Sequence, residues 1–99
     1  MTELTRHIDQ IRKLCATNKV RSLFVFGSIL SEGFKSDSDI DLIVDIDSND
    51  PLIYSDSYFN LKFQLEQLLN RKIDLLEQNT IQNPYLRRQI DETKVLIYG

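Results

Sequence analysis

The amino-acid sequence predicts an α/β (α+β) fold in which a small mixed β-sheet is flanked by helices. Short continuous apolar runs, typical of buried strands, alternate with stretches in which apolar residues recur every three or four positions, as in amphipathic helices. The chain has only 99 residues, which is enough for one core and one shallow site. No linker or repeat interrupts the alternation, so we expect residues 1–99 to form a single domain.

The first half of the chain predicts one helix and two strands. Apolar residues at helical spacing predict a helix that Thr2 caps and that ends near Asn18. Residues 23–26 are continuously apolar and predict a buried strand, which a Gly-Ser pair closes. A polar connector follows, and residues 40–46 predict a second strand that is interrupted by charged residues.

The second half continues the alternation after a loop predicted over 47–51. The same periodicities predict four elements: a helix over 58–69, a strand over 73–76, a helix over 84–90 and a strand over 95–98. Asp56 or Ser57 is the expected N-cap of the longer helix.

Composition excludes several classes of function. A single cysteine, Cys15, and a single histidine, His7, exclude a disulfide within the chain and a cysteine/histidine zinc site. Twelve basic against 15 acidic residues give a net charge of −3, which offers no general surface for nucleic acid. No apolar run is long enough to cross a membrane, and residues 1–10 are too polar for a signal peptide. We therefore expect a cytoplasmic domain with no membrane partner.

Three aspartates stand in or beside strands that are otherwise apolar. Strand interiors disfavour aspartate, yet Asp39, Asp41 and Asp74 occupy such positions. Residues two apart in a strand share a face, so Asp39 and Asp41 are expected to point the same way. Two carboxylates about 4.5 Å apart repel by roughly 3–4 kcal/mol at an effective dielectric constant of 20. A hard cation such as Mg²⁺, or Mn²⁺ as the alternative, would offset this repulsion.

Gly27-Ser28 ends the first strand where a helical turn can begin. Glycine allows a ligand to approach the backbone closely, exposed N–H groups at a helix start bind phosphate, and the serine hydroxyl adds a donor. A phosphate site that faces a carboxylate cluster is what phosphoryl or nucleotidyl transfer needs.

These residues resemble a known signature. The run Phe-Gly-Ser at 26–28, followed by Asp-Ser-Asp-Ile-Asp-Leu-Ile-Val at 37–44, is similar to that of the DNA polymerase β-like nucleotidyltransferase superfamily. In its short length the chain resembles the minimal nucleotidyltransferase (MNT) branch of that superfamily, to which the antitoxins of HEPN/MNT toxin–antitoxin pairs belong. The segment 71–76 resembles the strand that bears the third carboxylate.

The resemblance implies roles for particular residues. Asp39 and Asp41 would hold two Mg²⁺ ions, and Asp74 would hold one and help to deprotonate the incoming hydroxyl. Gly27 and Ser28 would bind the triphosphate of ATP. The acceptor would be a tyrosine on a partner HEPN toxin, which the transfer of AMP silences. The sequence leaves open whether this chain forms a homodimer.

The chain also departs from the family pattern. Many relatives carry an arginine-glycine pair where this sequence has Ser31-Glu32, and Lys35 could supply the missing positive charge at the nucleotide. The departure motivates an alternative, a non-catalytic antitoxin that neutralises its partner by forming a complex. A second alternative is a small-molecule nucleotidyltransferase, although such relatives generally carry an additional helical domain.

Four other sites have structural interpretations. Cys15 is expected to be a small apolar filler of the core. Asp45 is interpreted as a rim or salt-bridged residue outside the metal site, and Tyr58 as a core residue. The Arg71-Lys72 pair is interpreted as a charge pair at the C-terminus of a helix.

Overall fold

Four strands form one mixed sheet in the computed structural model, which describes residues 2–30 and 38–99. The elements are α1 (Thr2–Thr5), α2 (Ile8–Thr17), β1 (Val20–Phe26), the 3₁₀ helix η1 (Gly27–Leu30), β2 (Ile40–Ile46), α3 (Pro51–Leu69), β3 (Ile73–Glu77), the 3₁₀ helix η2 (Gln78–Thr80), α4 (Pro84–Thr93) and β4 (Val95–Tyr98). The strand order is β3-β2-β1-β4. β1 pairs antiparallel with β2 and β4, whereas β2 pairs parallel with β3. The predicted mixed sheet with flanking helices is confirmed.

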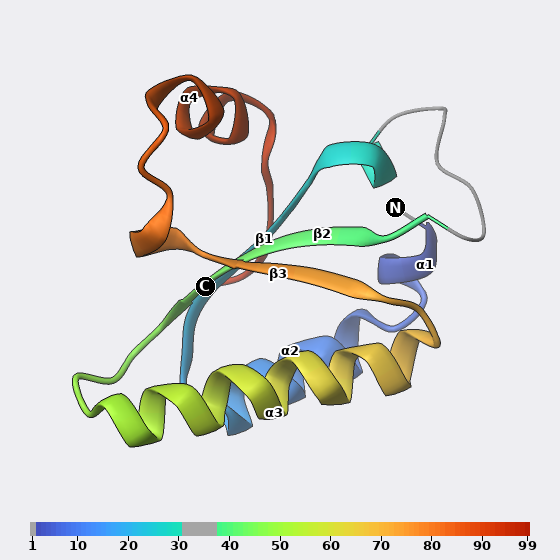
Figure 1. Cartoon of the computed structure of the whole chain (residues 1–99). Helices are drawn as coiled ribbons and strands as arrows, with labels where there is room; N and C mark the ends of the chain where they lie inside the picture. Colours follow the sequence, from blue (N-terminus) through green and yellow to red (C-terminus); the bar gives the residue numbers. More distant parts are fainter. Residues whose placement is uncertain (1, 31–37) are drawn as a thin grey trace.

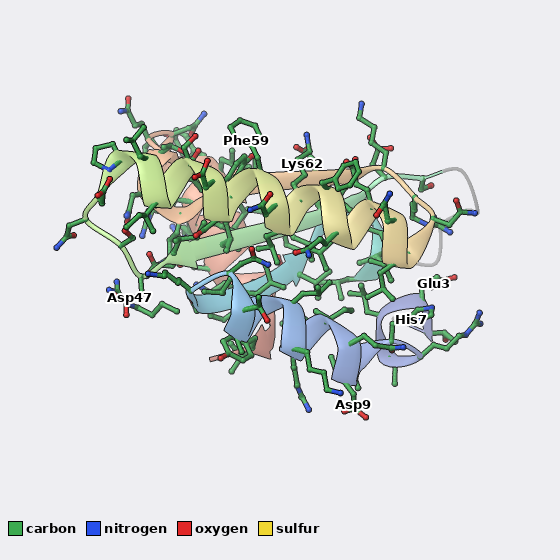
Figure 2. The ribbon with its side chains drawn as sticks, turned by 90° about the horizontal axis from the view of Figure 1, so that it is seen from below. Glu3, His7, Asp9, Asp47, Phe59 and Lys62 are labelled. Atoms are coloured by element: carbon green, nitrogen blue, oxygen red, sulfur yellow. The ribbon has the colours of Figure 1, made fainter. Side chains whose placement is uncertain are left out.

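The helices cover the two faces of the sheet unequally. Figure 1 shows α2 and α3 together on one face and α4 alone on the other. Figure 2 looks onto the first face, where α2 and α3 lie side by side. The amide of Asn18, which caps α2, donates to the side chain of Gln64 on α3 at 2.9 Å and so links the two helices.

Most of the apolar core lies between the sheet and the α2–α3 layer. Each strand supplies alternate residues to it; those of β2 are Ile40, Leu42, Val44 and Ile46. Cys15 is fully buried in this core, which confirms it as an apolar filler, and burial raises the pKa of its thiol to about 12. Ile43 points to the opposite face and is buried there, as is Ile90 of α4.

Several predicted helix boundaries are wrong. Thr2 lies within α1 instead of capping it, and α4 ends at Thr93 rather than at residue 90. The first helix is split into α1 and α2, because the backbone leaves helical geometry around Arg6 and His7. The helix predicted from residue 58 begins at Pro51, and its N-cap is Asp50 rather than Asp56 or Ser57. The Asp50 carboxylate accepts hydrogen bonds from the backbone N–H groups of the first helical turn, at 2.9 and 3.4 Å. Proline suits the first position of a helix because its missing N–H would have no partner there.

Among the described residues, no helix combines the length and the apolar character needed to cross a lipid bilayer.

Candidate active site

The backbone at the end of β1 lies directly against the carboxylate of Asp41. Phe26, the last residue of β1, pairs with Asp41 of β2 in the antiparallel register, and Gly27 follows with a positive φ of 79°. A Cβ added at Gly27 would lie 2.2 Å from Asp41 Oδ2. Glycine is therefore required here both by the backbone conformation and by the close approach of the carboxylate.

Asp41 and Asp74 occupy paired positions on neighbouring strands. In the parallel register of β2 and β3, Asp41 pairs directly with Asp74. Paired positions point to the same face, and the residues on either side of Asp74 are buried toward α2 and α3. Asp74 is exposed and Asp41 is half-buried, so both carboxylates lie on the α4 side of the sheet. Asp39 precedes β2 by one residue and is exposed.

One row of side chains thus crosses three strands on the same face. Directly paired residues of an antiparallel pair also share a face, so Phe26 lies beside Asp41, and Asp41 lies beside Asp74. Neighbouring strands are about 4.8 Å apart. The row places an aromatic ring, a carboxylate and a second carboxylate within reach of a single small ligand.

The donor type fits a hard divalent ion. Asp41 and Asp74 present only carboxylate oxygens, which Mg²⁺ and Mn²⁺ prefer. In residues 2–30 and 38–99, no three or more His, Cys, Asp or Glu side chains lie close enough together to hold a metal ion. The three-carboxylate metal site with Asp39 stays a prediction.

Several predicted nucleotide contacts lie outside the described residues. Lys35 and the Ser31-Glu32 pair fall within residues 31–37, and the side chain of Ser28 is likewise not described. The backbone of Ser28 belongs to η1, directly after Gly27, as the sequence predicted.

Arg71 has a role that sequence reasoning missed. Its guanidinium donates a hydrogen bond to the carbonyl oxygen of Ser38 at 2.8 Å, and the N–H of Ile40 donates to the carbonyl oxygen of Lys72 at 3.1 Å. These bonds tie the segment that carries Asp39 to the turn between α3 and β3. The interpretation of Arg71 as a helix-terminal charge did not include this contact, and no local pattern signals it because 33 residues separate the partners.

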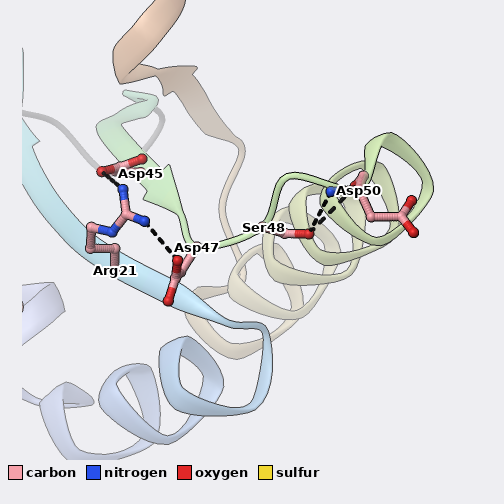
Figure 3. A network of polar contacts seen from close by, with 5 residues as sticks. All are labelled: Arg21, Asp45, Asp47, Ser48 and Asp50. Atoms are coloured by element: carbon pink, nitrogen blue, oxygen red, sulfur yellow. Dashed lines mark hydrogen bonds and ion pairs between the residues drawn. The ribbon is translucent and has the colours of Figure 1, made fainter.

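Asp45 is salt-bridged and lies outside the site, as predicted. Arg21 bridges Asp45 at 3.2 Å and Asp47 at 2.6 Å (Figure 3). Both carboxylates raise the pKa of the Arg21 guanidinium, with the hydrogen bond to Asp47 as the largest cause. The pair fixes the far end of β2 rather than taking part in the site.

The tyrosines of α3 have structural roles on the other side of the sheet. Tyr58 packs against the main core, which confirms its interpretation, and its hydroxyl donates to the carbonyl oxygen of Leu75. Tyr54 donates to Glu77 Oε2 at 2.9 Å. Burial, followed by the hydrogen bond to Glu77, raises the pKa of Tyr54 to about 12.

A hollow of about 320 Å³ opens beside Gly27 on the α4 side. One wall comes from the end of β1 and from η1, and the other comes from α4; the lining residues are Phe26, Gly27, Leu30, Leu86, Gln89, Ile90 and Thr93. The sequence did not predict this hollow, because it depends on how α4 packs over the sheet.

Comparison with known proteins places the chain in a family. The family model described as "Polymerase beta, Nucleotidyltransferase" matches residues 9–99. The chain belongs to this nucleotidyltransferase family. The predicted resemblance is confirmed, and the row of carboxylates lies in a nucleotidyltransferase domain.

Individual relatives agree with this assignment. MJ1379 of Methanocaldococcus jannaschii is 35% identical over 79 residues, which cover 80% of this chain and 78% of that protein. Protein adenylyltransferase MntA of Thermococcus cleftensis is 31% identical over 80 residues, which cover 81% of this chain and 75% of that protein.

Solved structures share the fold. One described as a minimal nucleotidyltransferase has a TM-score of 0.76 at 28% identity and covers 93% of this chain and 90% of that chain. A toxin–antitoxin crystal structure with AMP-PNP has a TM-score of 0.70 at 24% identity and covers 93% of this chain and 73% of that chain.

Proposed function

We propose that this chain transfers AMP from ATP to a hydroxyl group, most simply a tyrosine hydroxyl, of a partner HEPN toxin and so acts as its antitoxin. The observation that carries the proposal is the contact between Gly27 and Asp41, with Asp74 paired next to Asp41 on the same face. A glycine backbone that borders adjacent carboxylates matches the needs of nucleotidyl transfer.

The bond changes follow from this arrangement. The acceptor oxygen forms a bond to the α-phosphorus of ATP while the bond from that phosphorus to the bridging oxygen of the β-phosphate breaks, and pyrophosphate leaves. The hydroxyl proton passes to the carboxylate of Asp74, which is exposed and therefore accessible to an acceptor. The phosphates approach the backbone at Gly27 and Ser28, where β1 ends and η1 begins, next to the Asp41 carboxylate.

Asp39, Asp41 and Asp74 would hold Mg²⁺ in the loaded enzyme. When bound, the ion would neutralise the phosphate charge and favour deprotonation of the acceptor. The contribution of the chain itself is to hold the carboxylates on two hydrogen-bonded strands, so that little reorganisation accompanies the reaction.

The names of relatives support the choice of reaction and partner. One relative is a protein adenylyltransferase, and the same fold occurs in a toxin–antitoxin crystal structure with AMP-PNP. Among the described residues, the long helices α2 and α3 cover the other face, so a macromolecular acceptor can approach the carboxylates from the α4 side.

Label transfer tests the proposal. The purified chain is incubated with α-³²P-labelled ATP, MgCl₂ and a purified HEPN toxin as the candidate acceptor, and label on that toxin is measured. Asp41→Asn should lower the transfer rate by about 10²-fold or more, since it removes a charged ligand at the reacting centre. Asp45→Asn is the matched control, because Asp45 lies on the same strand and pairs with Arg21 instead.

The outcome also separates the enzyme from a non-catalytic antitoxin. If the wild-type chain neutralises the toxin without label transfer, and Asp41→Asn neutralises it equally well, occupancy alone explains the antitoxin and the proposal is refuted.

A further inference from the structure

We infer that Tyr85 is a second acceptor of AMP, and that one copy of the chain transfers AMP to the Tyr85 hydroxyl of another copy. The inference deepens the proposed function and rests on it, because it uses the same ATP and the same carboxylates with a different acceptor. Tyr85 follows Pro84 in the first turn of α4, the helix on the same side of the sheet as Asp41 and Asp74.

Tyr85 has the exposure that an acceptor for another molecule needs. Its side chain is 85% exposed, whereas the other three tyrosines of the chain, all of them among the described residues, are half-buried. Within the described part of the chain, nothing forms a hydrogen bond with the Tyr85 hydroxyl. The hydroxyl is therefore available to enter the active site of a second molecule.

The other tyrosine side chains are held by the fold. The hydroxyl of Tyr54 donates to Glu77, and that of Tyr58 donates to the carbonyl oxygen of Leu75. Burial raises the pKa of both phenols, to about 12 for Tyr54, so neither loses its proton readily. Tyr98 packs against the main core, on the face opposite the carboxylates. These three tyrosines are poor acceptors by comparison.

The orientation of α4 directs Tyr85 away from the active site of its own chain. Leu86 and Ile90 line the hollow beside Gly27. The side chain of residue 85 projects about 100° away from that of Leu86 around the helix axis. The Asn83 side chain caps this first turn, since it accepts from the N–H of Tyr85 at 2.9 Å, and Ile90, which is 2% exposed, anchors the helix. The hydroxyl therefore points outward, where a second copy can reach it.

Charge complementarity favours a second copy as the molecule that approaches. Arg88 lies three residues after Tyr85, and residues three apart are neighbours on a helix surface. Its side chain is 81% exposed and pairs with Glu92 at 3.0 Å. Such an exposed pair contributes little, so the guanidinium can exchange it for a phosphate oxygen. The site of the other copy presents Asp41, Asp74 and the phosphates of ATP, all of negative charge.

The transfer follows the same bond changes as transfer to a toxin. The phenol oxygen of Tyr85 forms a bond to the α-phosphorus of ATP held by the other copy, the bond from that phosphorus to the bridging oxygen of the β-phosphate breaks, and pyrophosphate leaves. The phenol proton passes to the Asp74 carboxylate of that copy. The product is a phosphodiester whose negative charge lies beside Arg88 at the start of α4.

Mass spectrometry of the purified chain, incubated with ATP and MgCl₂ in the absence of toxin, tests the inference. The intact mass should rise by one adenylyl group, and fragmentation should place this group on Tyr85. Tyr85→Phe should not gain the group. Tyr54→Phe is the matched control and should gain it as the wild-type chain does, because the Tyr54 hydroxyl is already bonded to Glu77. Equal melting temperatures of the variants exclude unfolding as the cause of a loss.

A mixing experiment separates transfer between copies from transfer within one copy. The wild-type chain and α-³²P-labelled ATP are mixed with a tagged Asp41→Asn chain, which keeps Tyr85 but lacks a carboxylate of the active site. Label should appear on the tagged chain, more slowly when that chain also carries Arg88→Ala, and not at all when it also carries Tyr85→Phe. Label confined to the wild-type chain, at a rate per chain that does not change with concentration, overturns transfer between copies.

The same assays distinguish failure of this inference from failure of the proposed function. A wild-type chain that labels a HEPN toxin but stays unmodified overturns the inference and leaves the proposed function standing, as does modification that persists in Tyr85→Phe. Modification of Tyr85 without transfer to a toxin supports the inference and refutes the toxin as acceptor. Transfer to neither acceptor refutes both.

Discussion

Replacing Gly27 by alanine should distort the site more than it destabilises the fold. The residue has a positive φ of 79°, a conformation that costs an alanine about 1–2 kcal/mol. The new Cβ would lie 2.2 Å from Asp41 Oδ2, whereas ordinary contacts begin near 3.4 Å. The carboxylate must therefore move by about 1 Å, a misplacement that costs about 10²-fold in rate.

A double-mutant cycle separates crowding from backbone strain. Gly27→Ala is compared in the wild-type background and in Asp41→Ala, which removes the carboxylate that the new Cβ would meet. Thermal and urea unfolding followed by circular dichroism give the free energies of unfolding. We expect the alanine to cost about 1 kcal/mol less in the Asp41→Ala background, within the usual range for residues in contact.

Either the unfolding measurement or the rate of AMP transfer can refute this reasoning on its own. If the losses of unfolding free energy in the two single variants add up to the loss in the double variant within about 0.3 kcal/mol, the side chain at residue 27 and the Asp41 carboxylate are not in contact. A folded Gly27→Ala chain that transfers AMP at the wild-type rate would mean that the close approach has no part in the reaction.

Three further predictions concern charge, capping and burial. Asp74→Asn should raise the melting temperature in EDTA by about 4–8 °C, because it removes about 1 kcal/mol of electrostatic repulsion between residue 74 and the paired Asp41. The same substitution should reduce the stabilisation that MgCl₂ and ATP give to the chain. An unchanged or lower melting temperature in EDTA contradicts this prediction. Asp50→Ala should cost about 1 kcal/mol in urea unfolding through loss of the α3 cap, while Asp50→Asn should keep most of the stability. Cys15 should react with a thiol reagent at pH 8 only as the chain unfolds, since burial raises its pKa to about 12; rapid reaction of the folded chain would contradict its burial.

The strands could be predicted because their signal is local. The continuous apolar run at residues 23–26 lies within β1, and the run at 40–46, which Asp41 and Asp45 interrupt, forms β2; each is too short to favour a helix. The break between α1 and α2 could not be predicted, because Leu4, Ile8 and Ile11 keep helical spacing across it and all pack toward the same core. The start of α3 was predictable in principle, since aspartate followed by proline is a helix-start pattern.

The candidate site could be predicted in part. The alternation of β2 placed Asp39, Asp41 and Asp45 on one side, and the strand around Asp74 was recognisable from its apolar neighbours. The pairing of Asp41 with Asp74 depends on the register of parallel strands, which 26 intervening residues of loop and helix set. The contact of Arg71 with Ser38 and the hollow under α4 depend on tertiary packing, for which the sequence has no local signal.

The residues of the apolar core and the carboxylates of the candidate site lie on opposite faces of the same strands. In β2, Ile40 and Leu42 face α2 and α3 and are at most 1% exposed, whereas Asp41 lies between them in the chain and on the other face. Because side chains alternate, one seven-residue strand can anchor the core and hold a carboxylate against Gly27. The polar face can therefore change with little loss of fold, while a change at Leu42 leaves a cavity and destabilises the whole sheet.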